Sequence, residues 1–311
     1  MDRKPAAVHT FPPHLLWLLV GLTLGWGFNW PAMKVTVSEM RPMHFRTVCL
    51  LAGAAGLFAF ALAGRLRIRV PAGQWGRLTA IALVNMAGCN IFAIYGISLI
   101  ASGRAAILGY TMPALAVLLS AWLLHEPFTP RRALGVLLGL GGMALLLGKE
   151  VLAVGRSPAG ALSMVAAAAA WALGTVLMKR WPVDLPTTSF TAWQMLLATV
   201  PVLALALGWE RGSFNPFSLS PGPMFGALYN IVVAFNFCYW AWTKIATEAP
   251  VGVSSLATMM IPVVGVFSSA LVLGEMPHWQ DYASLMLVVA SLATVLIPTA
   301  ATRLSGATSS T

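Results

Sequence analysis

Ten apolar segments, each about 20 residues long, divide this chain of 311 residues and limit the folds that it can adopt. A helix needs about 20 apolar residues to cross the hydrocarbon core of a bilayer. Hydrophobic residues make up 59% of the chain and charged residues only 9%, well below the roughly 25% of soluble domains. The sequence therefore predicts an all-α integral membrane protein with ten transmembrane helices, at residues 14–33, 43–63, 76–98, 103–124, 132–149, 158–178, 187–208, 222–243, 251–273 and 279–298.

The formal net charge of +10 does not indicate a nucleic-acid partner. The basic residues are assigned to short loops between apolar segments, where they set the topology and contact anionic lipid. Lys and Arg counts on alternate loops favour both termini in the cytoplasm, and the loop from Arg65 to Arg77 contributes most of the difference. The lipid bilayer is thus one expected partner.

The chain carries the same pattern twice. The segment Trp26–Lys34 returns as Trp171–Lys179, and Ala82–Asn85 returns as Ala227–Asn230, both after 145 residues. Two further matches have slightly shifted spacings: Asn90 with Asn236, after a slip of one residue, and Pro113…Glu126 with Pro262…Glu275. Two homologous halves in a very hydrophobic chain predict a membrane transporter whose site lies between them.

Each half holds five predicted spans, so the second half enters the membrane in the opposite sense to the first. Repeats inverted in this way place a substrate site near the bilayer midplane. The predicted domains are a first repeat at 1–150, a second repeat at 151–300 and a tail at 301–311, which is small and polar and therefore expected to be disordered.

The first span also contains a Trp-Gly-x-Asn sequence at residues 26–29, and in each half a mid-span proline precedes a glutamate at the helix end. With ten spans and two EamA-like halves, the chain resembles the drug/metabolite transporter superfamily over nearly its whole length. Within it, the chain is most similar to the aromatic amino-acid exporters of bacterial inner membranes. The resemblance implies a basket of spans 1–4 and 6–9 around a central cavity, with spans 5 and 10 supporting it from outside.

No acidic residue and no histidine lies in the middle of a predicted span. A charge inside the membrane is costly and normally marks an ion or proton path. Its absence argues against a multidrug pump with a central glutamate, a metal transporter and a membrane hydrolase. Glu126 and Glu275 occupy equivalent positions at span ends, where they are either gating or proton-binding groups or charges that anchor a helix end at the interface.

Uncharged polar side chains within the spans are the best candidates for a substrate site, because amides offer donors and acceptors that suit a zwitterion. Deep Trp side chains can stack on an aromatic solute or face its cation. The predicted substrate-binding residues are Trp26, Asn29, Asn85, Asn90, Tyr110, Trp171, Gln194, Tyr229, Asn230, Asn236 and Trp240. Alternatively, the amides hydrogen-bond between helices and the indoles only pack. Helical spacing predicts one shared face for Tyr229, Val233, Asn236 and Trp240.

Pro113 and Pro262 lie near the centres of predicted spans four and nine. A proline inside a helix lacks an amide donor and clashes with the carbonyl four residues earlier, here that of Gly109 or Thr258. Such carbonyls are tolerated at membrane depth only inside protein or beside a wet cavity, where they could receive a substrate ammonium. The two prolines are therefore candidate hinges, and a plain packing kink is the alternative.

The leading interpretation is an inner-membrane exporter of aromatic and other neutral amino acids and related metabolites, working by alternating access. Because no span has a central proton carrier, transport is predicted to be facilitated diffusion down the gradient of the solute. The alternative is proton-coupled efflux of drugs or other small metabolites. The sequence predicts a small-molecule substrate and no catalysis, cofactor or metal ion, and it leaves the oligomeric state open.

Overall fold

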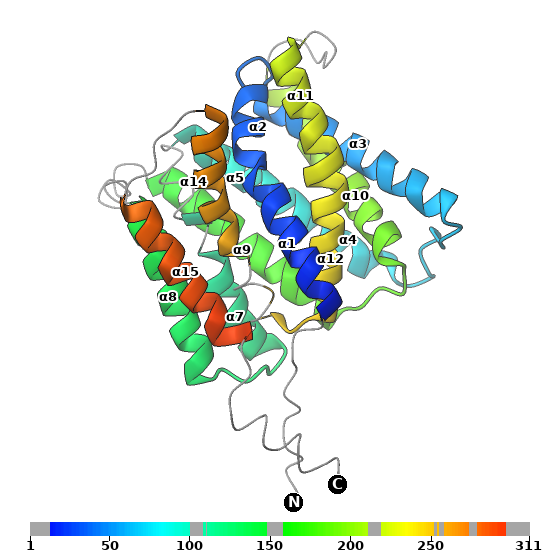
Figure 1. Cartoon of the computed structure of the whole chain (residues 1–311). Helices are drawn as coiled ribbons and strands as arrows, with labels where there is room; N and C mark the ends of the chain where they lie inside the picture. The colour runs from blue at the N-terminus through cyan, green and yellow to red at the C-terminus, as the bar shows by residue number, and fades with distance from the viewer. Residues whose placement is uncertain are drawn as a thin grey trace, which may run out of the picture.

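The computed structural model describes residues 13–99, 108–109, 111–147, 158–210, 219–251, 254, 258–273 and 279–296. Within these residues the regular elements are all helices (Figure 1). The first half contains α1 (Pro13–Gly27), α2 (Asn29–Thr36), α3 (Pro42–Ala63), α4 (Trp75–Ile81), η1 (Ala82–Gly88), α5 (Cys89–Leu99), α7 (Met112–Leu123) and α8 (Pro130–Leu147). The second half contains α9 (Pro158–Arg180), α10 (Thr187–Trp209), α11 (Pro221–Tyr229), η4 (Asn230–Cys238), α12 (Tyr239–Glu248), α14 (Met260–Leu273) and α15 (Trp279–Leu296).

Helices occupy each of the ten predicted segments, so the all-helical prediction is confirmed. Among the described residues, six stretches are long and apolar enough to cross a bilayer: His14–Met33, Pro42–Ala63, Trp75–Ala93, Pro158–Arg180, Thr187–Trp209 and Pro221–Glu248. Ten spanning helices in two inverted repeats stay a prediction.

In three of the predicted segments, regular helices follow one another with a single residue or a π-helix between them. Phe28 separates α1 from α2, the π-helix η1 joins α4 to α5, and the π-helix η4 joins α11 to α12. Asn85 lies within η1, and its counterpart in the repeat, Asn230, begins η4. Because π-helical turns are rare and occur frequently at functional sites, these segments are the first places to look for one.

Pro113 and Pro262 stand in the first turns of α7 and α14 instead of inside longer helices. Thr111 forms a turn before α7. Thr258 lies two residues before α14, and its carbonyl accepts the N–H of Ile261, the second residue of that helix, at 3.1 Å. A proline in a first turn gives up no helical hydrogen bond. The expected mid-helix kinks are therefore helix starts, the Thr258 carbonyl is not unpaired, and the role of the prolines as hinges stays a prediction.

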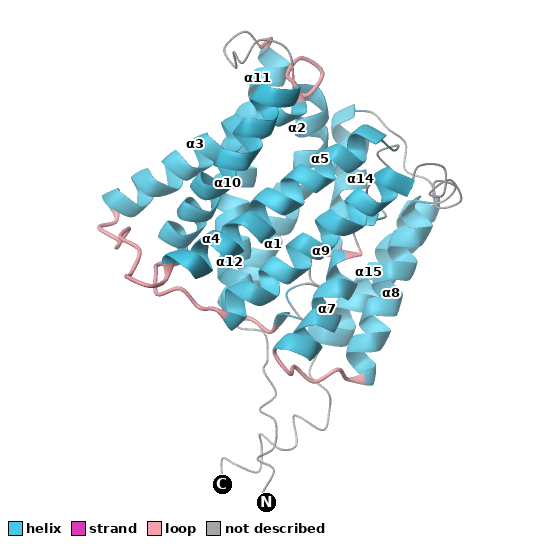
Figure 2. Ribbon diagram, turned by 180° about the vertical axis from the view of Figure 1, so that it is seen from behind, coloured by secondary structure: helices cyan, strands magenta, loops and turns pink. Residues whose placement is uncertain are grey.

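Helices of the two halves pack against each other. Helix α3 lies along α10, α5 and α7 lie along α9, and α1 and α2 contact α14, η4 and α11. Helices α8 and α15 pack mainly on each other at one side of the molecule, which is also visible from behind (Figure 2). The largest apolar cluster joins side chains of both halves, so the core lies between the halves.

Glycines permit the closest of these contacts. A Cβ atom on Gly174 of α9 would lie 2.6 Å from the Cα atom of Asn85 in η1. A Cβ atom on Gly226 of α11 would lie 2.5 Å from the carbonyl oxygen of Ala32 in α2. Small residues of this kind let membrane helices approach at backbone distance.

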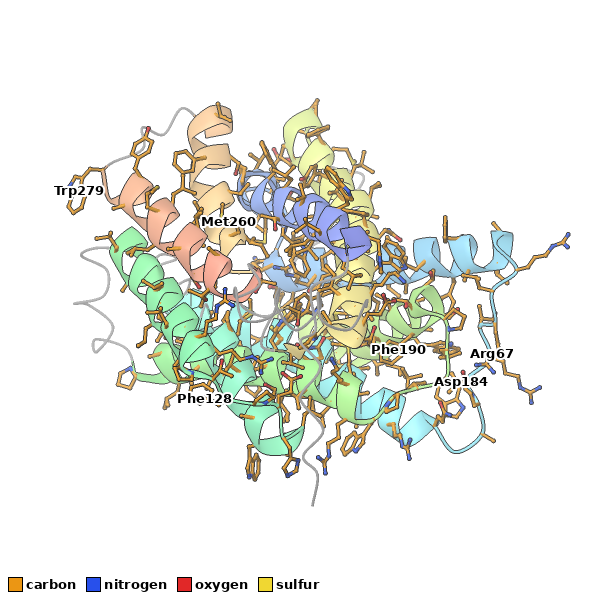
Figure 3. The ribbon with its side chains drawn as sticks, turned by 60° about the horizontal axis from the view of Figure 1, so that its bottom comes forward. Arg67, Phe128, Asp184, Phe190, Met260 and Trp279 are labelled. Carbon is orange, nitrogen blue, oxygen red and sulfur yellow. The ribbon has the colours of Figure 1, made fainter. Side chains whose placement is uncertain are left out.

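Large apolar side chains cover the outside of the bundle. Trp17, Trp122 and Trp279 are 77%, 73% and 67% exposed. Figure 3 shows Trp279 pointing away from the helices, at the edge of the molecule. So many exposed apolar side chains fit a protein whose surrounding solvent is lipid.

Candidate substrate site

Four aromatic side chains from three helices meet in the core: Trp26 of α1, Trp171 of α9, and Tyr239 and Trp242 of α12. We call them the central aromatic cluster. The ring centroid of Trp26 lies 5.8 Å from that of Trp171, 5.4 Å from Tyr239 and 6.4 Å from Trp242. Trp171 lies 5.9 Å from Tyr239 and stacks on Trp242 at 5.6 Å. Such ring contacts are favourable, and their faces can receive an aromatic or cationic group of a solute.

Three of the four rings are buried in this conformation, and Trp26 is partly buried. Trp171 and Tyr239 are each 8% exposed and Trp242 is 1% exposed. The indole Nε1 of Trp242 is buried and has no hydrogen-bond partner within the described residues. Because most buried polar groups are paired, this N–H is a donor available to a ligand.

Two of the predicted asparagines border the cluster. Asn85 Nδ2 donates to the Trp171 carbonyl at 3.1 Å, so it fixes the backbone that carries this indole. Asn90 Nδ2 donates to the Met86 carbonyl at 2.7 Å, and the Asn90 side chain also interacts with the Tyr239 hydroxyl. Both amides therefore position aromatic residues of the cluster.

Three other predicted amides each leave an oxygen unpaired. Asn29 Oδ1, Asn230 Oδ1 and Gln194 Oε1 are buried and accept no hydrogen bond from any described residue. Asn230 Nδ2 donates to the Gly226 carbonyl at 3.0 Å, and Gln194 Nε2 lies 4.0 Å from the sulfur of Met178. An unpaired buried acceptor costs about 1–3 kcal/mol. These oxygens are thus available to a donor such as an ammonium group.

The predicted common face in the eighth segment is wrong. Tyr229 donates its hydroxyl to the Gly25 carbonyl of α1 at 2.9 Å, and Val233 packs beside the same glycine. Asn236 instead packs against Gly56 of α3. A π-helix forms i→i+5 bonds and has a wider turn than an α-helix, so a step of seven residues no longer returns to the same face.

The slip of one residue in the sequence repeat falls within η4. Asn90 Nδ2 donates to Met86, four residues earlier, whereas Asn236 Nδ2 donates to the carbonyl of Ile231, five residues earlier, at 2.8 Å. Helix η4 has nine residues and η1 has seven. The additional residue of the second half is thus accommodated by a longer π-helix.

The same change of register decides which aromatic residues of the eighth segment reach the core. Trp240 packs with Phe237 at 6.5 Å and makes no ring contact with the cluster. Tyr239 and Trp242, on either side of it in α12, form the cluster contacts instead. Trp242 is absent from the predicted site, because its selection depends on the wider turn of η4.

Charged groups tie several helix ends together where α7 ends and α8 begins. Glu126 Oε1 accepts the N–H of Val251 at 3.0 Å, and Oε2 lies 3.2 Å from Arg132 Nη1. Lys179, at the end of α9, donates to the carbonyl of Ala249. We call Glu126, Arg132 and Lys179 the Glu126 network. It joins the ends of α7, α8, α9 and α12, so Glu126 cross-links span ends in this conformation.

A cavity of about 170 Å³ lies next to this network. Its walls come from α9, α10, α12 and the segment before α10, through Met178, Lys179, Pro182, Val183, Leu185, Thr187, Phe190, Thr243 and Thr247. Figure 3 labels Phe190 and also the ion pair of Arg67 and Asp184, whose Nη2 and Oδ2 atoms lie 2.8 Å apart. Met178, which lines the cavity, lies two helical turns, about 10 Å, from Trp171 on α9.

Two predicted site residues, Tyr110 and Glu275, lie outside the described residues. Within the described chain, no three His, Cys, Asp or Glu side chains come together as a metal site would require. Arg46 was counted with the basic residues of the outer segments although it falls within the predicted span 43–63; it lies inside α3 and is the only Lys, Arg, Asp or Glu of that helix. A single charge within an apolar segment could have identified Arg46 as a candidate functional residue from the sequence.

A helical bundle of membrane-spanning length with a closed aromatic site at its centre has the architecture of a small-molecule membrane transporter. The sequence profile of the EamA-like transporter family matches residues 14–148 and, a second time, residues 158–297. The chain belongs to the EamA-like transporter family. It is therefore a multi-pass membrane protein and a transporter.

Several relatives carry transporter names, and one solved structure shares the fold. The uncharacterized transporter YoaV of Bacillus subtilis is 25% identical over 83% of this chain and 88% of its own length. A probable amino-acid metabolite efflux pump of Salmonella typhimurium is 23% identical over 86% of this chain and 89% of its own length. One protein of known crystal structure superposes with a TM-score of 0.79 at 20% identity, over 91% of this chain and 97% of that chain, so the two share a fold.

Proposed function

We propose that the protein exports aromatic and other neutral amino acids, with related metabolites, across a bacterial inner membrane by alternating access. The observation that carries this proposal is the central aromatic cluster with unpaired polar atoms in the same core. Its rings suit an aromatic or apolar side chain, and the oxygens of Asn29 and Asn230 suit an ammonium. The Salmonella relative named as an amino-acid metabolite efflux pump supports the same substrate class.

The two halves, residues 1–150 and 151–300, are proposed to be inverted repeats. Exchanging the halves turns the contact of η1 with α9 into that of η4 with α1, the contact of α5 with α9 into that of α12 with α1, and the contact of α7 with α9 into that of α14 with α1. The pairs α3–α10 and α8–α15 map onto themselves. The two family matches and the two π-helices support this symmetry. In such a symmetric protein, equivalent contacts in the two repeats can close opposite sides of a central site in turn.

With both termini in the cytoplasm, the Glu126 network faces the cytoplasm and closes the pathway there. Export then requires these contacts to separate so that solute enters beside Lys179 and Phe190. The symmetry assigns the opposite closure to Glu275. Reporter fusions at Gly155 and Gly212 test the topology: periplasmic signals at both support it, and cytoplasmic signals at both refute it.

Transport is proposed to be facilitated diffusion. The cluster contains no carboxylate or imidazole among its members, and Glu126 is engaged with Val251 and Arg132 at a helix end. A carrier of this kind needs only two packings of similar free energy that substrate allows to interconvert. Proton-coupled efflux through Glu126 or Glu275 is the alternative, because both carboxylates belong to span ends that alternating access would rearrange.

Counterflow in proteoliposomes tests the function directly. Vesicles loaded with L-phenylalanine should take up labelled L-phenylalanine at equal pH and zero membrane potential. The Glu126→Gln and Glu275→Gln variants should each retain part of this flux. Uptake that requires an imposed proton gradient and disappears in either variant would establish the proton-coupled alternative. No amino-acid flux under any condition would refute the exporter.

A further inference from the structure

One basic side chain lies close to the core and has no role in the site described so far. Arg46 is the fifth residue of α3, about 6 Å along the helix axis from its first residue, and it is half-buried. Its Nη2 lies 3.2 Å from the sulfur of Met33. Its guanidinium carbon lies 6.0 Å from the ring centre of Phe45 and 5.8 Å from that of Phe235. A thioether and two ring faces are soft, weak partners for a full charge.

Arg46 has no carboxylate partner within the described chain. The ion pairs there join other residues. Glu210, which caps the same end of α3, directs its two oxygens to the backbone N–H groups of Met43 and His44, at 2.9 and 3.0 Å. The acidic group at this helix end is therefore used for capping and does not neutralise Arg46.

An unneutralised guanidinium at this position is costly and needs an anion. Arg stays protonated in proteins, and it carries five N–H donors in a planar fork. A charged side chain within a membrane helix normally faces the protein interior and marks a substrate or ion path. A carboxylate fits the fork with two parallel charge-assisted hydrogen bonds.

Ring contacts connect Arg46 to the central aromatic cluster. The Phe235 ring, which faces Arg46, lies 5.0 Å from the Tyr239 ring, and Tyr239 lies 5.4 Å from Trp26. The charge of Arg46 also acts on the Tyr239 hydroxyl. Arg46 is therefore linked to the cluster through the Phe235 ring, which lies beside both the guanidinium and Tyr239.

We propose that Arg46 binds the carboxylate of the transported solute, so that the site selects small carboxylates with an aromatic or apolar side chain. The inference rests on the proposed function, because it names the group by which the exported solute is recognised. Aromatic amines without a carboxylate lack this contact and therefore bind more weakly. A lipid phosphate has related chemistry, but the aromatic residues between Arg46 and Trp26 favour an aromatic carboxylate.

Equilibrium binding to the purified protein in nanodiscs of neutral lipid tests the proposal, with quenching of tryptophan fluorescence as the readout. The probes are L-phenylalanine, 3-phenylpropionate, which lacks the ammonium, and L-phenylalaninamide, which lacks the carboxylate. The wild-type protein should bind both carboxylates at least about tenfold more tightly than the amide. Arg46→Gln should weaken carboxylate binding by about 10- to 100-fold and leave amide binding unchanged.

Two variants serve as controls. Arg41→Gln removes an exposed charge just before α3 and should bind all three probes as the wild-type protein does. Arg46→Lys keeps the charge but loses the planar fork, so its carboxylate affinity should fall between those of the wild-type and Gln proteins. This variant tests the proposal even if Arg46→Gln does not fold.

Several results would overturn the inference. They are equal carboxylate affinity in Arg46→Gln and Arg41→Gln, wild-type affinity for the amide equal to that for phenylalanine, and no carboxylate binding by the wild-type protein. Loss of wild-type phenylpropionate binding when phosphatidylglycerol replaces the neutral lipid would assign Arg46 to lipid instead. Binding of phenylpropionate that depends on Arg46, without amino-acid flux in proteoliposomes, would refute the exporter and retain the anion site.

Discussion

In the central aromatic cluster, side chains meet through ring faces and edges, and Trp242 Nε1 keeps no partner among the described residues. In the Glu126 network, by contrast, the contacts are hydrogen bonds and ion pairs: Glu126 accepts from Val251 and pairs with Arg132, and Lys179 donates to a carbonyl. The difference separates two tasks. A core that leaves polar atoms unpaired has capacity for a ligand, whereas an end whose charges are paired stabilises one closed conformation.

Removing a ring from the cluster should have the largest effect. Trp171→Ala deletes a side chain that touches three other rings, and such truncations cost about 3–5 kcal/mol. Transport by the folded fraction should fall far below that of Trp279→Ala, since Trp279 is 67% exposed. Proteoliposome flux at matched amounts of folded protein measures this. Equal flux from both variants would remove Trp171 from the site.

Separating the helices that hold the cluster should have the next largest effect. In Gly174→Ala, the new Cβ would lie 2.2 Å from the Cβ of Asn85, so α9 and η1 must move apart. Overpacking of this kind costs about 1–3 kcal/mol, which thermal unfolding in detergent would detect. Gly208→Ala is the matched control, because nothing lies within 4 Å of its added Cβ. Similar melting temperatures for the two variants would contradict the close approach.

Weakening the Glu126 network should open one end and leave the cluster intact. Glu126→Gln keeps an acceptor for Val251 but loses the ionic part of its bond to Arg132, worth about 1 kcal/mol. Maleimide labelling of Thr247→Cys in the adjacent cavity should then rise about fivefold. Glu248→Gln, in a more exposed pair with Lys244, should change labelling little. Unchanged labelling in Glu126→Gln would show that the network does not hold this end closed.

The smallest effect is expected at an exposed contact beyond the other end of the helices. The Ser220 hydroxyl and amide donate to the two oxygens of Glu39, at 2.6 and 2.8 Å, and these bonds lower the pKa of Glu39 below its ordinary value of 4.5. A carboxylate with a lowered pKa stabilises the fold above pH 4.5, and this contribution is lost as the pH falls through the folded-state pKa. Ser220→Ala should therefore melt slightly earlier than the wild-type protein at neutral pH.

The two melting temperatures should converge as the pH falls below that window. A difference that grows on acidification would have the wrong sign for this hydrogen bond. Because Glu39 is fully exposed, the effect should also remain well below that of Glu126→Gln.

Apolar length predicted where the helices lie, because the requirement for about 20 apolar residues is a property of the bilayer and can be counted in the sequence. The repeat related Trp26 to Trp171, and the structure brings their rings within 5.8 Å. The repeat was therefore enough to relate two rings of the cluster, and Tyr239 was also a candidate as a polar side chain within a span.

The other features depend on backbone geometry that the sequence pattern does not contain. Trp242, and not Trp240, joins the central aromatic cluster because η4 has the wider π turn, which a 3.6-residue period does not include. Arg46 was missed for another reason: the search of the spans for charges covered acidic residues and histidine, and Arg46 was counted only as a topology signal although α3 begins where it was predicted. The prolines were predicted inside helices because the interruptions before α7 and α14 leave no mark in the hydrophobic pattern.

The additional residue held in η4 also has a mechanical consequence. If η4 converted to α-helical geometry, the chain after it would shift by one residue in helical register. Helix α12 would then rotate by about 100° relative to α11. Tyr239 and Trp242 would rotate with it and leave Trp26, while the backbone hydrogen bonds would only exchange partners. A one-residue register change would therefore separate the rings of the central aromatic cluster at low energetic cost, without unfolding any helix.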